Sequence, residues 1–302
     1  MHIPDSMLNG AVCPVTATLS AIGIIAATYY AYKSKDKPTA LSFGAITALI
    51  FAGQMMNFAI MDGTSGHLLG GVLAASLLGT PFGVLAIALV VTVQSLVFSD
   101  GGLTVLGANI FNMAILGAGV GGLLRTRLAN QWQGEKGGYL ATLVAAWFSV
   151  VLASFAVSVE LAIDGQIAFD NVLPAMMGVH AMIGVGEAII TLAACLLLSS
   201  SFAAQQTHGK ALVTLAGAAV VALLLSPFAS GHPDGLEWVA EKYSFLQASA
   251  PTFVSPLPDY TVPALGDAAI STGLAGLLGV IITFVVAFLM VRLTGLAFAK
   301  HA

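Results

Sequence analysis

Residues 269–293 read AISTGLAGLLGVIITFVVAFLMVRL, and this stretch decides the fold class. Its one charged side chain is Arg292, which stands next to the end of the stretch. A helix needs about 20 consecutive apolar residues to cross the hydrocarbon core of a bilayer. The stretch therefore predicts a membrane-spanning helix.

The composition of the whole chain agrees with that prediction. Hydrophobic residues make up 58% of the 302 positions, and charged residues make up only 8%. A soluble domain carries about 25% charged residues, so a chain this apolar belongs in lipid. We therefore predict an all-α membrane protein. The ten Lys and Arg residues form no basic stripe, which argues against nucleic-acid binding.

Nine apolar runs are candidate membrane spans. The third run is short and flanked by glycines, so it is either a full crossing or a half-helix that re-enters the protein. We predict a polytopic helical bundle of about nine transmembrane segments. The runs lie near residues 12–32, 40–60, 67–79, 81–99, 106–124, 138–162, 174–200, 211–226 and 269–293.

The basic residues predict which way the bundle faces. Nine of the ten follow or close the first, fifth, seventh and ninth runs, and only Lys242 falls on the opposite side. Cytoplasmic loops are enriched in Lys and Arg, so those four ends are expected inside the cell. The N-terminus is then outside and the C-terminus is cytoplasmic, provided that all nine runs cross.

The composition changes after the eighth run. A polar, proline-rich segment extends from Pro227 to Asp267 between two apolar runs. We therefore interpret residues 1–205 as one membrane domain. Residues 206–302 form a second, two-span domain with an external loop.

The first two residues, Met1 and His2, have the covalent geometry of a metal chelate. A bulky second residue normally leaves the initiator methionine in place, so we expect a free amine at the surface. The amine and the His2 amide nitrogen close a five-membered ring on a metal, and the amide and the imidazole Nδ1 close a six-membered ring. Three nitrogens then lie in one plane, which suits divalent metals at the Ni²⁺ and Cu²⁺ end of the series. The fourth planar position remains for another imidazole.

His67 is our candidate for that fourth position. Of the six histidines, His208 and His301 fall on the predicted cytoplasmic side, and His232 lies in the loop of the second domain. His67 stands in DGTSGHLLGG, where flanking glycines permit close approach of the backbone and the predicted topology places it at the outer face. A histidine in a glycine-rich loop can equally be structural, so this choice depends on the chelate.

Several polar residues are candidates to support the metal ligands. His180 and Glu187 lie seven positions apart on one helix face. An ionisable pair inside the membrane is either functional or a buried polar contact that fixes helix packing. Amides can orient a ligating imidazole, and carboxylates can offset charge or simply cap turns. The candidates for supporting roles are Asp5, Asn57, Asp62, Ser65, Asn109, Asn112, His180 and Glu187.

Four stretches carry a resemblance to a known family. They are MHIPD at the start, NFAIMDGTSGHLLGG, GANIFNM and HAMIGVGEAIIT. Together they resemble the CbiM/NikM proteins, the substrate-capturing membrane component of energy-coupling-factor (ECF) cobalt and nickel transporters, over roughly 1–205. The later stretch SPFASGHPDGLEWVAEKY resembles the PDGLE domain, which is similar to the NikN component.

The resemblance implies a capture domain with seven spans and an outside N-terminus in the cell membrane of a prokaryote. It implies that the metal is held by the amine of Met1, the amide and imidazole nitrogens of His2, and His67. The implied partners are a transmembrane coupling protein similar to CbiQ or NikQ and cytoplasmic ATPases similar to CbiO or NikO. Ni²⁺ or Co²⁺ is then the transported substrate, and no organic cofactor is expected.

We therefore predict the metal-binding component of an ATP-driven importer of Ni²⁺ or Co²⁺, and not an enzyme. The sequence contains no G-x-x-x-x-G-K-S/T loop to bind ATP and no H-E-x-x-H motif. The planar nitrogen set favours nickel over cobalt. Two alternatives remain, namely a proton-coupled carrier or channel with His180 and Glu187 as the relay, and a metal sensor that does not transport.

Overall fold

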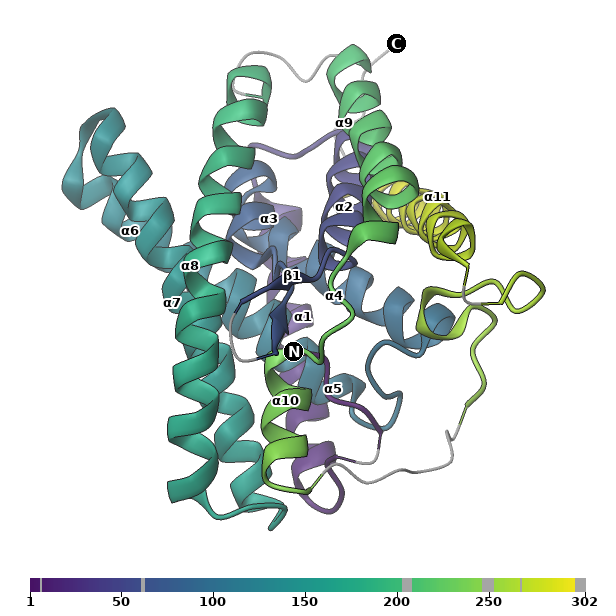
Figure 1. Cartoon of the computed structure of the whole chain (residues 1–302). Coiled ribbons are helices and arrows are strands. Elements are labelled where there is room, and N and C mark those ends of the chain that lie inside the picture. Colours follow the sequence, from purple (N-terminus) through teal and green to yellow (C-terminus); the bar gives the residue numbers. More distant parts are fainter. Residues whose placement is uncertain (6, 61–62, 203–207, 246–252, 267, 297–302) are drawn as a thin grey trace.

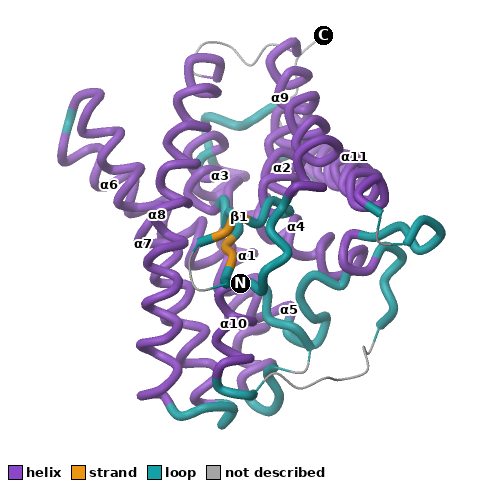
Figure 2. The backbone as a smooth tube through the Cα atoms, in the orientation of Figure 1, coloured by secondary structure: helices purple, strands orange, loops and turns teal. Residues whose placement is uncertain are grey.

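The protein is an almost entirely helical bundle. The computed structural model describes residues 1–5, 7–60, 63–202, 208–245, 253–266 and 268–296. Within these residues the only sheet is a pair of two-residue strands, β1 (Phe58–Ala59) and β2 (Ser65–Gly66), which lie close to the N-terminus in Figure 2. The predicted all-α fold is confirmed.

Seven helical stretches in the described part of the chain are long and apolar enough to cross a membrane, so the protein is a multi-pass membrane protein. Four are single helices: α1 (Val12–Lys33), α7 (Gly134–Ile163), α8 (Phe169–Phe202) and α11 (Ala269–Leu293). The other three contain π-helical turns. They are α4 (Thr80–Val93) with η1 (Gln94–Phe98), α5 (Leu106–Asn109) with η2 (Ile110–Val120) and α6 (Gly121–Trp132), and α9 (His208–Val220) with η3 (Val221–Leu225) and the 3-10 turn η4 (Ser226–Phe228).

Two of the nine predicted spans are shorter than a bilayer crossing. The run at 40–60 forms α2 (Ala40–Gln54), a helix of 15 residues. The run at 67–79 forms α3 (Gly71–Leu78), a helix of eight residues bracketed by two glycines with positive φ, Gly70 (φ 72°) and Gly79 (φ 85°). The count of nine crossings is therefore not confirmed, and the orientation that depended on it stays a prediction.

Packing explains why α2 and α3 are short. Most residues of both helices are buried, so protein and not lipid satisfies the backbone at their ends. A Cβ added to Gly71 would lie 2.6 Å from the backbone carbonyl carbon of Gly117, which shows that α3 packs directly on η2. The half-helix alternative for 67–79 fits this arrangement.

The C-terminal third of the chain packs on the first two thirds. Both α9 and α11 contact α2 along its length. A short amphipathic helix, α10 (Gly235–Lys242), lies against α8 and just below the N-terminus in Figure 1, and the 3-10 turn η5 (Pro258–Tyr260) follows it in the chain. The N-terminus itself lies in the middle of the bundle and not at one end (Figure 1).

Candidate metal site

The N-terminal residues are inserted into the protein interior. Met1 is 4% exposed and His2 is 8% exposed, so the expectation of an amine free at the surface is wrong. The physical reason is a pair of reciprocal hydrogen bonds: the Ile3 backbone N–H donates to Asn109 Oδ1 (2.8 Å), and Asn109 Nδ2 donates to the Ile3 carbonyl (3.0 Å). The Gly102 N–H donates to the same carbonyl at 2.9 Å. Ile3 is thereby fixed, and the two residues before it have no freedom to leave.

The amine of Met1 meets two side chains from distant parts of the chain. It is in direct contact with His67 Nε2, and it donates to Asp234 Oδ2 at 2.5 Å. The rings of His2 and His67 are stacked, with centroids 5.0 Å apart and planes inclined by 16°. Nitrogen donors separated by 66 positions in the sequence are therefore gathered at one buried point.

The imidazole of His67 is held with one nitrogen turned toward the amine. Its Nδ1 lies 3.0 Å from the Leu68 carbonyl, an acceptor, so the proton belongs on Nδ1 and the lone pair on Nε2. Burial, together with the charges of the Met1 amine and His2, lowers the pKa of His67 to about 3. A neutral imidazole is the form that a metal requires.

The loop that carries His67 is fixed by Glu187. The Glu187 carboxylate accepts hydrogen bonds from the Leu69 N–H (2.7 Å) and the Gly70 N–H (2.9 Å). On the other side, β2 is joined to the C-terminal segment, because the Ser65 N–H donates to the Pro233 carbonyl at 2.8 Å. The loop is thus held from α8 and from the residues that precede α10.

The imidazole of His2 belongs to a closed ring of hydrogen bonds. Its Nε2 lies 3.1 Å from Gln94 Oε1, and its Nδ1 lies 3.0 Å from Asp100 Oδ1. Gln94 Nε2 donates to the Tyr260 hydroxyl (3.1 Å), which donates to Asp100 Oδ2 (2.5 Å). Burial raises the pKa of Asp100, but the contacts with His2 and Tyr260 outweigh burial and leave that pKa below its usual value.

Comparison with known proteins decides the family. The model of the family CbiM, described as the cobalt uptake substrate-specific transmembrane region, matches residues 2–204. The chain belongs to the CbiM family. A second model, the PDGLE domain, matches residues 208–295 of this CbiM-family chain. The family consists of metal transport proteins and not of enzymes.

Relatives and solved structures agree with that assignment. The chain is 32% identical to a putative fused nickel transport protein NikMN of Archaeoglobus fulgidus, over 97% of this chain and 98% of that protein. It is 28% identical to the fused nickel transport protein NikMN of Rhodobacter capsulatus, over 93% and 94% of the two chains. A crystal structure of a truncated transition metal transporter matches with a TM-score of 0.59 at 27% identity, over 66% of this chain and 99% of that one.

The carboxylates at the site of this CbiM-family chain differ from those chosen on sequence proximity. Asp5 instead accepts hydrogen bonds from the Thr104 N–H (2.8 Å) and hydroxyl (2.7 Å), and Asp62 lies outside the described residues. The acids that face the nitrogen ligands are Asp100 and Asp234. No sequence motif around Asp100 indicated that it lies at the site. Asp234 stands in the PDGLE motif, in the segment predicted to form the external loop of the second domain.

The other supporting candidates have mixed positions. Asn109 anchors Ile3 beside the site, whereas the Asn112 amide donates to Glu160 Oε2 at 2.8 Å. The Ser65 hydroxyl donates to the His232 carbonyl (2.8 Å). The Asn57 backbone carbonyl accepts from the Ser230 N–H (2.8 Å). Asn57 and Ser65 therefore join the loop of His67 to the C-terminal segment and do not orient an imidazole.

His180 and Glu187 are both fully buried but are not joined to each other. No hydrogen bond or ion pair between them occurs in the described part of the chain. Glu187 holds the loop after His67, as described above, and His180 Nδ1 lies 2.9 Å from the Met176 carbonyl. The geometry therefore lacks the direct contact that a proton relay between these two side chains would need.

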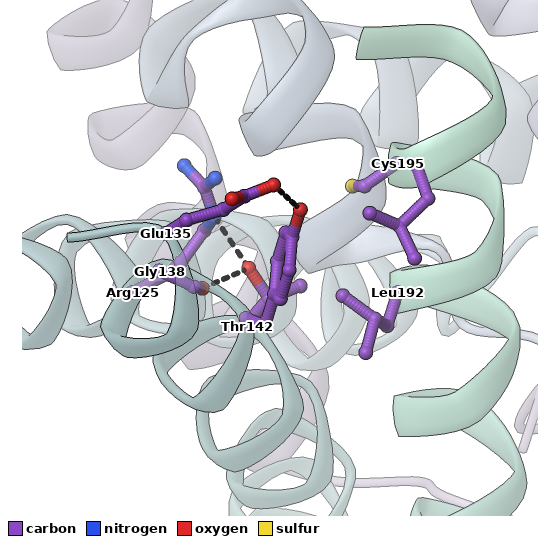
Figure 3. Close-up of a pocket in the computed structure, with 8 residues that line it drawn as sticks. Arg125, Glu135, Gly138, Thr142, Leu192 and Cys195 are labelled. Carbon is purple, nitrogen blue, oxygen red and sulfur yellow. Dashed lines mark hydrogen bonds between the residues drawn. The ribbon is translucent and has the colours of Figure 1, made fainter. Parts of the chain in front are cut away.

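Side chains alone do not make a metal site here. Within the described ranges, no group of three or more His, Cys, Asp and Glu side chains is arranged to hold a metal ion. A cavity of about 470 Å³ between α6, α7 and α8 contains Arg125, Glu135 and Cys195 (Figure 3), and none of the candidate ligands lines it. The chelate predicted at the N-terminus differs from such a group, because it also uses backbone nitrogens.

Proposed function

We propose that the chain is the metal-capturing membrane component of an ATP-driven ECF-type importer of Ni²⁺ or Co²⁺. The observation that carries the proposal is the buried contact between the Met1 amine and His67 Nε2, which brings the N-terminal chelate and a distant imidazole together. Burial at a chain terminus is unusual, because most termini are poorly ordered unless something ties them down.

The proposed site uses four nitrogens. The amine of Met1, the amide nitrogen and Nδ1 of His2, and Nε2 of His67 are the donors. Metal binding displaces the amide proton and one proton of the Met1 ammonium group. Nδ1 of His2 lies 3.0 Å from Asp100, so coordination replaces this contact. The opposite nitrogens already face acceptors, Gln94 for His2 and Leu68 for His67, which is the usual way in which the ring of a metal ligand is oriented.

Transport requires other chains. Because the sequence has no phosphate-binding loop, ATP would be hydrolysed by separate cytoplasmic ATPases, linked to this chain by a transmembrane coupling protein. We assign residues 1–205 to metal capture, with the N-terminus toward the outside of the cell, and residues 206–302 to the PDGLE-type domain. The metal is captured from the outer side and released inward when the ATPases drive a change of conformation.

Nickel is the preferred substrate. Square-planar nitrogen ligation suits Ni²⁺ better than Co²⁺. The two relatives that span nearly the whole chain are named as nickel transport proteins, whereas a relative from Sorangium cellulosum, 28% identical over 66% of this chain and 91% of that protein, is named as a cobalt transport protein.

Metal binding by the purified chain tests the proposal. Isothermal titration of the full chain in detergent with NiCl₂ and then CoCl₂ should give one ion per chain, with tighter binding of Ni²⁺. The nickel complex should show the absorption band of a planar nitrogen site. Absence of binding of both ions at one equivalent would contradict the proposed function, and tighter binding of Co²⁺ would reverse the preference.

A further inference from the structure

The PDGLE-type segment contributes a side chain directly to the candidate metal site. Asp234 Oδ2 lies 2.5 Å from the Met1 amine and 3.8 Å from His67 Nε2. Metal–nitrogen bonds are about 2 Å long. An ion bound by the Met1 amine therefore lies within about 4.5 Å of this carboxylate, the sum of the 2.5 Å contact and one such bond.

Asp234 is held in place by its second oxygen. Oδ1 accepts hydrogen bonds from the backbone N–H groups of Leu236 (2.8 Å) and Glu237 (2.9 Å), which makes Asp234 the N-cap of α10. The Glu237 carboxylate accepts a hydrogen bond from the Asp234 N–H at 3.1 Å, which completes a capping box. One carboxylate thus has two separate tasks, because Oδ1 starts the helix while Oδ2 faces the ligands.

A second residue of the same segment reaches the site from the other side. The Tyr260 hydroxyl donates to Asp100 and accepts from Gln94, and both of these side chains contact the His2 imidazole. The Tyr260 ring is stacked on Phe98 with centroids 4.6 Å apart, so the hydroxyl is fixed by packing. Asp234 therefore contacts Met1 directly, and Tyr260 contacts the two side chains that hold His2.

We propose that the PDGLE-type segment is part of the metal site, with Asp234 as the positioning residue and counter-charge for the ligands Met1 and His67. This inference rests on the proposed function. A divalent ion bound through one deprotonated amide keeps a net positive charge, and a buried carboxylate within a few ångströms offsets it more effectively than solvent would. Docking of α10 and binding of the metal then stabilise each other, because linkage between two binding events is reciprocal.

The competing explanation is that Asp234 merely caps α10. Asp234→Asn separates the two roles, because asparagine is as good an N-cap as aspartate but carries no charge. Glu237→Ala is the matched control, since it breaks the reciprocal half of the cap without touching the amine. Tyr260→Phe removes the hydroxyl and keeps the ring, and Tyr243→Phe, at a half-exposed position in the same segment, is its control.

The experiment is titration of the full-length variants with NiCl₂, combined with thermal unfolding in the absence of metal. Asp234→Asn should lower nickel affinity about 10- to 100-fold, the usual cost of losing an outer partner of a metal ligand. It should also lower the metal-free unfolding temperature, because the buried Met1 amine loses its counter-charge. Glu237→Ala should lower the metal-free unfolding temperature and leave the affinity within about threefold of the parent, since a cap acts on the helix and not on the ligands. Tyr260→Phe should weaken nickel binding and Tyr243→Phe should not.

Three results would overturn the inference. One is unchanged nickel affinity in Asp234→Asn. The second is an equal loss in Asp234→Asn and Glu237→Ala. The third result applies if Asp234→Asn does not fold. In that case, equal nickel affinities of Tyr260→Phe and Tyr243→Phe would overturn the inference. Failure of the proposed function itself looks different, because the parent protein would then bind neither Ni²⁺ nor Co²⁺, and His67→Ala would change nothing.

Discussion

Insertion of one glutamine between Met1 and His2 tests the chelate most directly. Glutamine is bulky enough to leave the initiator methionine in place, so the altered chain begins Met-Gln-His. Ile3 stays anchored by hydrogen bonds of 2.8, 3.0 and 2.9 Å to Asn109 and Gly102. Because one residue adds about 3.8 Å of chain, the amine can no longer keep both its 2.5 Å contact with Asp234 and its contact with His67.

The magnitude follows from what the insertion removes. The shifted amine leaves its place beside His67. The Met-Gln-His terminus itself offers an amine, two amide nitrogens and an imidazole, which fill all four planar positions without His67. His67→Ala should therefore change the nickel affinity of the Met-Gln-His chain little. Loss of an outer partner of a ligand already costs about 10- to 100-fold in metal affinity, so in the parent His67→Ala should cost at least about 100-fold. This is about 2.8 kcal/mol. The metal-free protein should also lose stability, because Asp234 is left as a buried carboxylate without its cation.

The assay is nickel titration of the purified protein, after mass spectrometry has verified the new N-terminus. The matched control carries the same glutamine between Lys35 and Asp36, in the exposed turn that follows α1. The control should bind nickel like the parent. An equal loss of nickel affinity on His67→Ala in the Met-Gln-His protein and in the parent would refute the reasoning, because His67 would then bind the metal whatever the spacing between the amine and His2.

The remaining predictions concern the other ligand, its loop, the orientation and acid stability. His67→Ala should lower nickel affinity at least about 100-fold and His208→Ala should not, and calorimetry that finds equal losses would place the site elsewhere. Glu187→Gln should weaken nickel binding about tenfold, because the two loop amides after His67 lose a charged acceptor; unchanged affinity would show that the loop is held without it. In a background without native cysteines, a cysteine at Gly231 should react with a membrane-impermeant reagent added outside intact cells and one at Asp36 should not; the reverse pattern would invert the topology. Because the pKa of His67 is about 3 in the folded protein and about 6.5 in an unfolded chain, the unfolded state binds more protons below pH 6.5. Acidification to pH 5 should therefore cost the metal-free parent about 2 kcal/mol more than it costs His67→Gln, and equal pH profiles of apparent unfolding temperature would argue against a buried neutral imidazole.

The sequence was sufficient to predict the fold class, whereas the chelate at the chain terminus stays a prediction. Apolar runs such as 269–293 depend only on composition, and α11 (Ala269–Leu293) has the predicted bounds. The chelating potential of Met1 and His2 follows from covalent geometry. Hydropathy did not distinguish a helix that crosses the membrane from an apolar helix that is surrounded by protein. A buried helix such as α3 is apolar but does not need the length of a bilayer crossing.

Long-range contacts were beyond the reach of sequence patterns. His180 and Glu187 share a helix face as their spacing predicts, but spacing says nothing about what that face meets, and Glu187 binds two backbone amides. Proximity along the chain pointed to Asp5, whereas Asp234 contacts the amine from 233 positions away. Only the docking of α10 brings this carboxylate to the N-terminus.

The contact between Met1 and Asp234 has a consequence for biogenesis. During synthesis the first residue to leave the ribosome is separated by 233 positions from the residue that later pairs with its amine. The amine therefore stays without this carboxylate while all the helices that precede α10 are made and inserted. A nascent chain that has reached residue 205 already contains Met1, His2 and His67 but not Asp234, the acid that pairs with the amine. Asn109 can anchor Ile3 early in synthesis, but the amine of Met1 completes its contacts only after α10 has been made, and an N-terminal affinity tag would block that step.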